Sequence, residues 1–173
     1  LHRDSEARSM IDGLRAARYV SYALDVELSG KVMLKGFSQG GHTAMATQRE
    51  IEANHLDEFN LVATAPMAGP FQLEESFMDA FTDPDIPNIA AGLLFGYTLQ
   101  SYQGVYGNMY NDISEVVQTP FDDVITNSFP GQFSLLELLF SGQLPSDPNI
   151  ALQADFITDF INGNHPMREA LAQ

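Results

Sequence analysis

Cysteine is absent from this sequence. Disulfide bonds, thiol catalysis and cysteine-ligated zinc are therefore excluded within it. Its four histidines form no pair with the spacing of a zinc site, and no glycine-rich loop matches a nucleotide-binding fingerprint. We therefore expect the chemistry of this protein to need neither a metal nor a cofactor.

Basic residues are also scarce. Only 8 Lys and Arg stand against 23 Asp and Glu, and the formal net charge is −15. This balance repels polyanions, so we expect neither nucleic acid nor an anionic membrane surface as a partner. No apolar run is long enough to predict a transmembrane helix. The first residues include neither a starting methionine nor the apolar stretch of a signal peptide, so we expect a chain processed or cut from a longer one.

The residues that are present suit a folded protein. Apolar residues make up 45% of the 173 positions, and 12 of them are phenylalanine. A chain of this length can bury one substantial core. The character of the sequence changes near residue 70, so we expect two parts, 1–70 and 71–173.

The first part opens with a predicted helix. Apolar residues at helical spacing run from Asp4 or Ser5, either of which can cap the helix, to about Leu24. Half of the basic residues of the chain lie on this element. Among them, Arg15 and Arg18 are candidates for pairing with carboxylates elsewhere.

Two strands follow in this part. Short apolar runs predict buried parallel strands at residues 31–35 and 61–65, with a helix over 40–54 between them. Helix, strand, helix, strand is the order of an α/β fold with a parallel sheet. Ligands of such sheets bind at the carboxyl ends of the strands.

Beyond residue 70 the pattern indicates no further strand. Short helical patterns, separated by proline and glycine, are expected at residues 73–82, 89–102, 111–117, 121–126, 133–141 and 150–161. One interpretation is a plain all-helical subdomain. We favour a cap over an apolar pocket, because this part follows a strand whose end lies beside the motif described next.

The most informative stretch lies between the first strand and the second helix. Residues 36–40 read Gly-Phe-Ser-Gln-Gly and fit the G-x-S-x-G pattern of a nucleophile elbow, in which a serine occupies a strained turn after a strand. Glycines two positions either side of Ser38 remove side chains that would collide there. The turn would raise the Ser38 hydroxyl above the sheet edge and make the backbone N–H of Gln39 half of an oxyanion hole.

Three motifs together resemble α/β-hydrolases. They are Leu-Arg-Ala-Ala-Arg at 14–18, Gly-Phe-Ser-Gln-Gly-Gly-His at 36–42 and Ala-Pro-Met-Ala-Gly-Pro-Phe at 65–71. With residues 162–171 as the end of the helical part, the chain is most similar to the secretory lipase/esterase group, which carries a large helical cap. The motif at 36–41 alone also resembles acyl-protein thioesterases and small carboxylesterases, which lack so long a helical insertion.

This resemblance implies a partial α/β-hydrolase core, with two parallel strands and flanking helices, followed by the all-helical cap. It implies that Ser38 is the nucleophile, that Gln39 supplies an oxyanion N–H, and that the cap lines an acyl pocket. It also implies that the family's first strands precede Leu1, and that the acid and the histidine of the triad follow Gln173. Aromatic candidates for the pocket, for which a place in the helix core is the alternative, are Phe37, Phe71, Phe95 and Tyr97.

The histidines offer weaker ways to complete a triad within the chain. His42 would point along its helix, which favours packing or a hydrogen bond over a role as the base. His55, at a helix end, is expected to bond free carbonyls, and His2 is expected at the surface. His165 follows the serine and several aspartates in the right order, so it is the remaining weak candidate for the base.

Three functions stay open. The first is a serine hydrolase of carboxylic esters, of lipase or esterase type, that acts on an ester or lipid-like substrate through an acyl-enzyme on Ser38. The chain alone would then be an incomplete fragment without the triad acid and base. The second is an inactive fragment or binding remnant that self-associates, or pairs with missing parts of its parent, through open sheet edges. The third is a hydrolase of the thioesterase or peptidase type. A secreted or periplasmic location accompanies the lipase resemblance.

Overall fold

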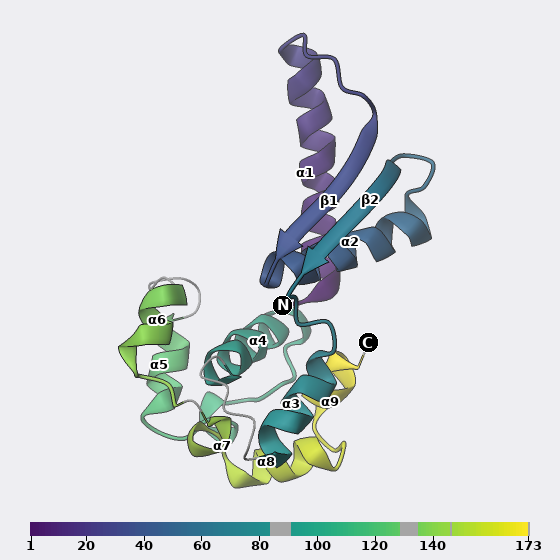
Figure 1. Cartoon of the computed structure of the whole chain (residues 1–173). Coiled ribbons are helices and arrows are strands. Elements are labelled where there is room, and N and C mark those ends of the chain that lie inside the picture. Colours follow the sequence, from purple (N-terminus) through teal and green to yellow (C-terminus); the bar gives the residue numbers. More distant parts are fainter. Residues whose placement is uncertain (84–90, 129–134, 146, 173) are drawn as a thin grey trace. The chain divides into compact units, whose positions relative to one another are not determined.

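The computed structural model describes residues 1–83, 91–128, 135–145 and 147–172. The chain divides into two compact units, Leu1–Phe71 and Gln72–Gln173 (Figure 1). The first unit contains, in chain order, α1 (Arg3–Ala23), β1 (Lys31–Phe37), α2 (Gln39–Asn54) and β2 (Asn60–Met67). The elements of the second unit are α3 (Leu73–Thr82), α4 (Ala91–Tyr106), the short 3₁₀ helix η1 (Ile113–Glu115), α5 (Phe121–Ser128), α6 (Leu135–Ser141), α7 (Pro148–Ala151), α8 (Ala154–Ile161) and α9 (Pro166–Leu171).

The two strands of the first unit form a parallel sheet. Lys31 pairs with Asn60 at one end and Phe37 with Met67 at the other, and the register shifts once, after Val32. The predicted α/β class with two parallel strands is therefore confirmed. Both strands run two or more residues beyond the apolar runs that predicted them, because strand pairing continues into the glycine- and proline-containing turns.

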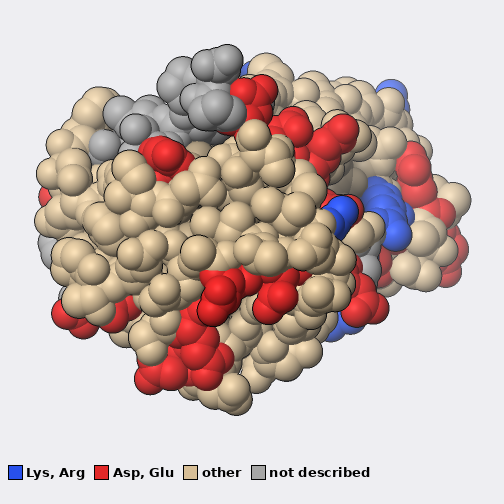
Figure 2. All heavy atoms as spheres, turned by 90° about the horizontal axis from the view of Figure 1, so that it is seen from below, with Lys and Arg blue, Asp and Glu red and all other residues tan. Residues whose placement is uncertain are grey.

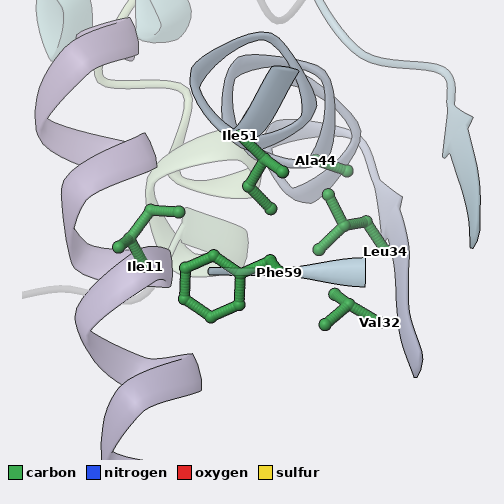
Figure 3. Close-up of a cluster of buried hydrophobic side chains, with 6 residues drawn as sticks. All are labelled: Ile11, Val32, Leu34, Ala44, Ile51 and Phe59. Carbon is green, nitrogen blue, oxygen red and sulfur yellow. The ribbon is translucent and has the colours of Figure 1, made fainter. Parts of the chain in front are cut away.

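One face of this sheet is covered by helices. Val32 and Leu34 of β1 point toward Ile11 of α1 and Ile51 of α2, with Phe59 between them, and Ala44 completes the cluster (Figure 3). Ile51 and Phe59 are 0% and 1% exposed. Burying such side chains stabilises a fold by about 1.5–3 kcal/mol each. The alternate residues of β1 have no such cover, and Met33 and Phe37 are 71% and 70% exposed.

The arginines of α1 fasten that helix to the segment before β2. The guanidinium of Arg15 donates to both carboxylate oxygens of Glu58, at 2.8 and 2.7 Å, as predicted for a pairing with a distant carboxylate. Arg18 differs from the prediction. It donates to the backbone carbonyl of Glu58 at 2.8 Å, and its guanidinium stacks 4.4 Å from the ring centre of Phe59.

The N-cap of α1 also differs from the prediction. His2, and not Asp4 or Ser5, caps the helix, and its Nδ1 accepts from the backbone N–H of Ser5 at 3.3 Å. An unprotonated imidazole nitrogen can accept this bond as the usual carboxylate or hydroxyl oxygen does. His2 is accordingly half-buried and not a free surface side chain.

The helices of the second unit lie at the predicted ranges, although α4 and α5 end four and two residues later than predicted, and two ranges differ more. The range 111–117 forms only the 3₁₀ turn η1, and the range 150–161 is divided between α7 and α8. Leu152 interrupts the second range because it forms an isolated antiparallel bridge with Val117, supported by the bond from Gln153 N–H to the carbonyl of Val116 at 2.9 Å. The predicted starts at residues 89 and 133 lie outside the described residues.

Aromatic rings form the core of the second unit. They come from α3, α4 and α8, and the ring centres of neighbouring pairs lie 5.2–6.3 Å apart, mostly edge to face. Such pairs add about 0.5–1.5 kcal/mol each beyond the area they bury. The five rings of this aromatic cluster belong to Phe77, Phe81, Phe95, Phe156 and Phe160.

The surface reflects the composition. On the face that Figure 2 shows, Asp and Glu occur in several separate places and outnumber Lys and Arg. No helix in the described ranges is both long and apolar enough to cross a membrane.

Candidate active site

A strained turn joins β1 to α2. β1 ends at Phe37 and α2 begins at Gln39, so the single residue Ser38 makes the turn. Its φ of 54° and ψ of −122° lie in a region that residues with a side chain rarely adopt. The backbone N–H of Ser38 donates to the carbonyl of Met67 at 2.9 Å, which ties the turn to the end of β2. Ser38 is exposed at the carboxyl end of its strand, where ligands of parallel sheets bind.

Two glycines allow the backbone to close around this turn. A Cβ at Gly36 would lie 1.8 Å from the carbonyl oxygen of Gly40, and one at Gly41 would lie 2.7 Å from the carbonyl oxygen of Met67. Neither position has room for a side chain. The second motif glycine, Gly40, differs, because a Cβ there meets no heavy atom of the described structure within 4 Å. The G-x-S-x-G pattern is therefore sterically strict at its first glycine and permissive at its second.

The turn after β2 places a second strained residue beside the first. Ala68, which follows Met67, has a φ of 48°. Gly69 then packs so closely that a Cβ on it would lie 2.7 Å from the backbone nitrogen of His42 and 2.7 Å from the ring of Phe71. Strained residues persist only where their surroundings over-determine them, and they cluster at functional sites. The adjoining ends of the two strands meet that description.

A mostly buried carboxylate lies against the first turns of α2, and no sequence pattern indicates it. Glu6 of α1 accepts hydrogen bonds from the Nδ1–H of His42 at 2.8 Å, the hydroxyl of Thr43 at 2.8 Å and the side-chain amide of Gln39 at 3.0 Å. Burial raises the pKa of Glu6, but these hydrogen bonds outweigh the effect of burial and lower the pKa to about 2. Glu6 is therefore ionised at neutral pH. Because an ionised carboxylate only accepts, the Nδ1 of His42 carries a proton.

The third histidine of the first unit also has carboxylate partners. His55 lies 3.4 Å from a carboxylate oxygen of Glu50 and 3.6 Å from one of Glu58. The expectation that it bonds free helix-end carbonyls is therefore wrong about the partner. The ring of His55 instead lies near acidic side chains five residues before it and three residues after it.

His165 lies in the second unit and caps a helix. Its Nδ1 accepts from the backbone N–H of Met167 at 3.2 Å, and its ring packs edge to face on Phe156 with the centres 4.7 Å apart. Burial lowers the pKa of His165, although the backbone of Met109 and the charge of Asp159 act in the opposite direction. These contacts are those of a residue that caps a helix.

The aromatic pocket candidates differ in burial. Phe37 and Phe71, in the first unit, are 70% and 52% exposed. Tyr97 is half-buried on α4. Phe95 is 1% exposed and enclosed by the rings of the aromatic cluster, so we assign it to the core and correct its place in the pocket set.

The first unit also carries a groove that is separate from the Ser38 turn. A groove of about 300 Å³ on the first unit is lined by Arg8, Ile11, Asp12, Arg15, Glu50 and His55. It includes neither Ser38 nor Gln39 and has a polar lining, so it does not have the properties of an acyl pocket. Across the described ranges, no three His, Asp or Glu side chains are grouped so that they could hold a metal ion.

Comparison with known proteins identifies the fold. No protein-family model and no curated protein matches the chain. Among solved structures, the rice cell wall degrading esterase LipA from Xanthomonas oryzae is 42% identical, with a TM-score of 0.91 over 99% of this chain. A ligand-bound form of LipA is 43% identical, with a TM-score of 0.90. The chain has an esterase-like α/β-hydrolase fold.

The hydrolase fold extends to a more distant structure. A proposed hydrolase from Legionella pneumophila is 24% identical, with a TM-score of 0.84 over 99% of this chain and 44% of its own. The chain spans 46% of LipA, and 45% in the ligand-bound form. The predicted resemblance to α/β-hydrolases of the lipase/esterase kind is thus confirmed for the part of the fold that the chain spans.

Proposed function

We propose that this chain carries the nucleophile of a serine hydrolase that cleaves carboxylic esters. Ser38 is the nucleophile and the backbone N–H of Gln39 is one oxyanion donor. The observation that carries the proposal is the backbone of Ser38, a serine at φ 54° between a parallel strand and a helix, at the carboxyl end of the sheet. The 42% identity with LipA, which is named as an esterase, supports the same chemistry.

The reaction follows from these positions. The Ser38 hydroxyl oxygen attacks the ester carbonyl carbon while its proton passes to a general base, and the carbonyl oxygen takes up negative charge. The amides at the start of α2, Gln39 first among them, offer N–H groups and the positive end of the helix dipole to that charge. The intermediate collapses, the alcohol leaves with the proton, and the acyl group remains on Ser38. Water then attacks the acyl-enzyme and releases the acid.

The base and its orienting carboxylate are not assigned within this chain. In the described part of the chain no hydrogen bond joins the Ser38 hydroxyl to a histidine, and the rings of His42, His55 and His165 contact Glu6, two carboxylates and a helix end, respectively. We infer that an active enzyme needs residues outside 1–173, and that the helical second unit acts as the cap that selects the acyl group. The description of LipA as acting on the rice cell wall supports a secreted location for this chain as well.

The proposal is tested on the product of the complete gene and on residues 1–173 alone. The complete protein should hydrolyse a p-nitrophenyl ester and react with a fluorophosphonate at Ser38, and Ser38→Ala should abolish both. The isolated chain should do neither. A complete protein with full esterase activity after Ser38→Ala would contradict the proposal.

A second candidate is a binding remnant that self-associates. It is favoured by one observation, since each of the two described strands is paired on one side only and exposes apolar residues such as Met33. Analytical ultracentrifugation of the isolated chain at several concentrations distinguishes the two candidates. A dimer that retains no reactivity of Ser38 favours the remnant, whereas activity restored by the flanking sequence favours the enzyme.

A further inference from the structure

Glu6 stands out as a charged residue whose side-chain partners all lie on the helix of the nucleophile; its one other partner is the N-terminal ammonium of Leu1, 3.7 Å away. Its three side-chain donors, Gln39, Thr43 and His42, all lie within the first five residues of α2. Its side chain is 14% exposed. A carboxylate so buried is stable only when its oxygens are satisfied, and here both of them are.

The start of α2 needs such a support. Ser38 at its N-cap makes no side-chain capping bond, and Gly40 and Gly41 give the first turn little stiffness of its own. The hydroxyl of Thr43 lies 2.8 Å from a carboxylate oxygen of Glu6 and 3.0 Å from the carbonyl oxygen of Gln39, so its one proton is shared between Glu6 and the backbone of the first turn. The negative charge also lies beside the positive end of the helix dipole.

The contact between α1 and α2 does not depend on Glu6 alone. Ile11 and Ile51 bury the apolar part of that contact, and Arg15 separately ties α1 to Glu58, in the segment before β2, by two hydrogen bonds. What Glu6 adds is specific to the residues next to Ser38. The Gln39 side chain that it holds belongs to the residue whose backbone N–H is the proposed oxyanion donor.

We propose that Glu6 is a positioning residue for the nucleophile turn: its carboxylate fixes the first turn of α2, and thereby the Ser38 hydroxyl and the Gln39 amide, in the reactive arrangement. This role rests on the proposed function of Ser38. Reacting groups must be held within a fraction of an ångström, and a displacement of about 1 Å costs roughly 100-fold in rate. Glu6→Ala should therefore lower the catalytic rate and leave substrate binding unchanged.

The test compares variants of the complete protein. Glu6→Ala should lower kcat and the rate of fluorophosphonate labelling by about 10- to 100-fold, with KM within about 3-fold. Glu6→Gln keeps the shape and one accepting oxygen, so it should recover most of the loss and remain within about 10-fold of wild type. Glu58→Ala is the matched control, since it also removes a carboxylate that anchors α1. It should leave kcat within about 2-fold even where it lowers Tm.

Each outcome decides the matter. Wild-type labelling rates in Glu6→Ala, or an equal loss of kcat in Glu58→Ala, would overturn the role of Glu6 while the esterase function stands. If Glu6→Ala does not fold, a Glu6→Gln protein with wild-type Tm decides, since a kcat loss of 2- to 10-fold supports the role and an unchanged kcat overturns it. A wild-type protein that neither labels nor turns over refutes the esterase function, and the role of Glu6 with it.

Discussion

The two glycines of the G-x-S-x-G motif should respond in opposite ways to the same substitution. Gly36→Ala places a Cβ 1.8 Å from the carbonyl oxygen and 2.1 Å from the carbonyl carbon of Gly40. Gly40→Ala places its Cβ in open space, with no heavy atom of the described structure within 4 Å. Neither glycine has a positive φ, so packing and not backbone conformation decides both outcomes.

The change in stability that each substitution causes depends on which atoms must move to make room for the new Cβ. Real Cβ atoms essentially never approach other heavy atoms closer than 3.0 Å, so the end of β1 and the start of α2 must separate by more than an ångström in Gly36→Ala. Overpacking costs about 1–3 kcal/mol where side chains can yield. Here the obstacle is backbone, so we expect a loss of about 3 kcal/mol or more. In Gly40→Ala, the gain in helix propensity should stabilise α2 by about 0.5–1 kcal/mol.

The assay must report on the first unit. Because two units need not unfold together, hydrogen exchange of peptides from β1 and α2 should be measured beside far-UV circular dichroism, in a protein that has no tryptophan. For a two-state unit of the size of Leu1–Phe71, a loss of 3 kcal/mol lowers Tm by roughly 12–24 °C. Gly36→Ala should also lose fluorophosphonate labelling of Ser38. Equal protection of β1 in both variants, or a larger loss in Gly40→Ala, would refute the steric reasoning.

Two further results are expected. Phe95→Ala should lower the free energy of unfolding by about 3–5 kcal/mol, because it opens a cavity in the aromatic cluster. Phe140→Ala is the control: its ring is 79% exposed, so the free energy of unfolding should change by no more than about 0.5 kcal/mol. Equal effects of the two substitutions in urea denaturation would contradict the assignment of Phe95 to the core. The stability contributed by Glu6 is complete above its unfolded pKa of 4.5 and is lost as pH falls toward its folded pKa of about 2. The difference in Tm between wild type and Glu6→Gln should therefore shrink over that interval, and a difference independent of pH would count against the ionised network.

The parts of the fold that could be predicted are those encoded by near neighbours in the sequence. Apolar runs located both strands, and the spacing of apolar residues located α1 and α2 to within one or two residues. What failed depends on partners far along the chain. The pattern over 150–161 is continuous, and only its bridge to Val117, 35 residues before Leu152, divides it. Likewise Phe95 resembles a pocket aromatic until rings from α3 and α8 enclose it.

In the candidate site, too, the features set by neighbouring residues could be predicted, and the contacts with distant residues could not. The reason is the free-energy cost of the strained turn. A strained residue such as Ser38 costs on the order of 1–3 kcal/mol, and the flanking glycines that permit it are written beside it in the sequence. These glycines allow the strained backbone of Ser38, but they do not stabilise it. The groups that hold the turn are the carbonyl of Met67, at the end of another strand, and the carboxylate of Glu6, on a helix 32 residues before Ser38. Neither has a local signature, since an acid in the first turn of an amphipathic helix is ordinary. A motif therefore locates the strained nucleophile, while the contacts that keep it strained emerge only once the chain is folded.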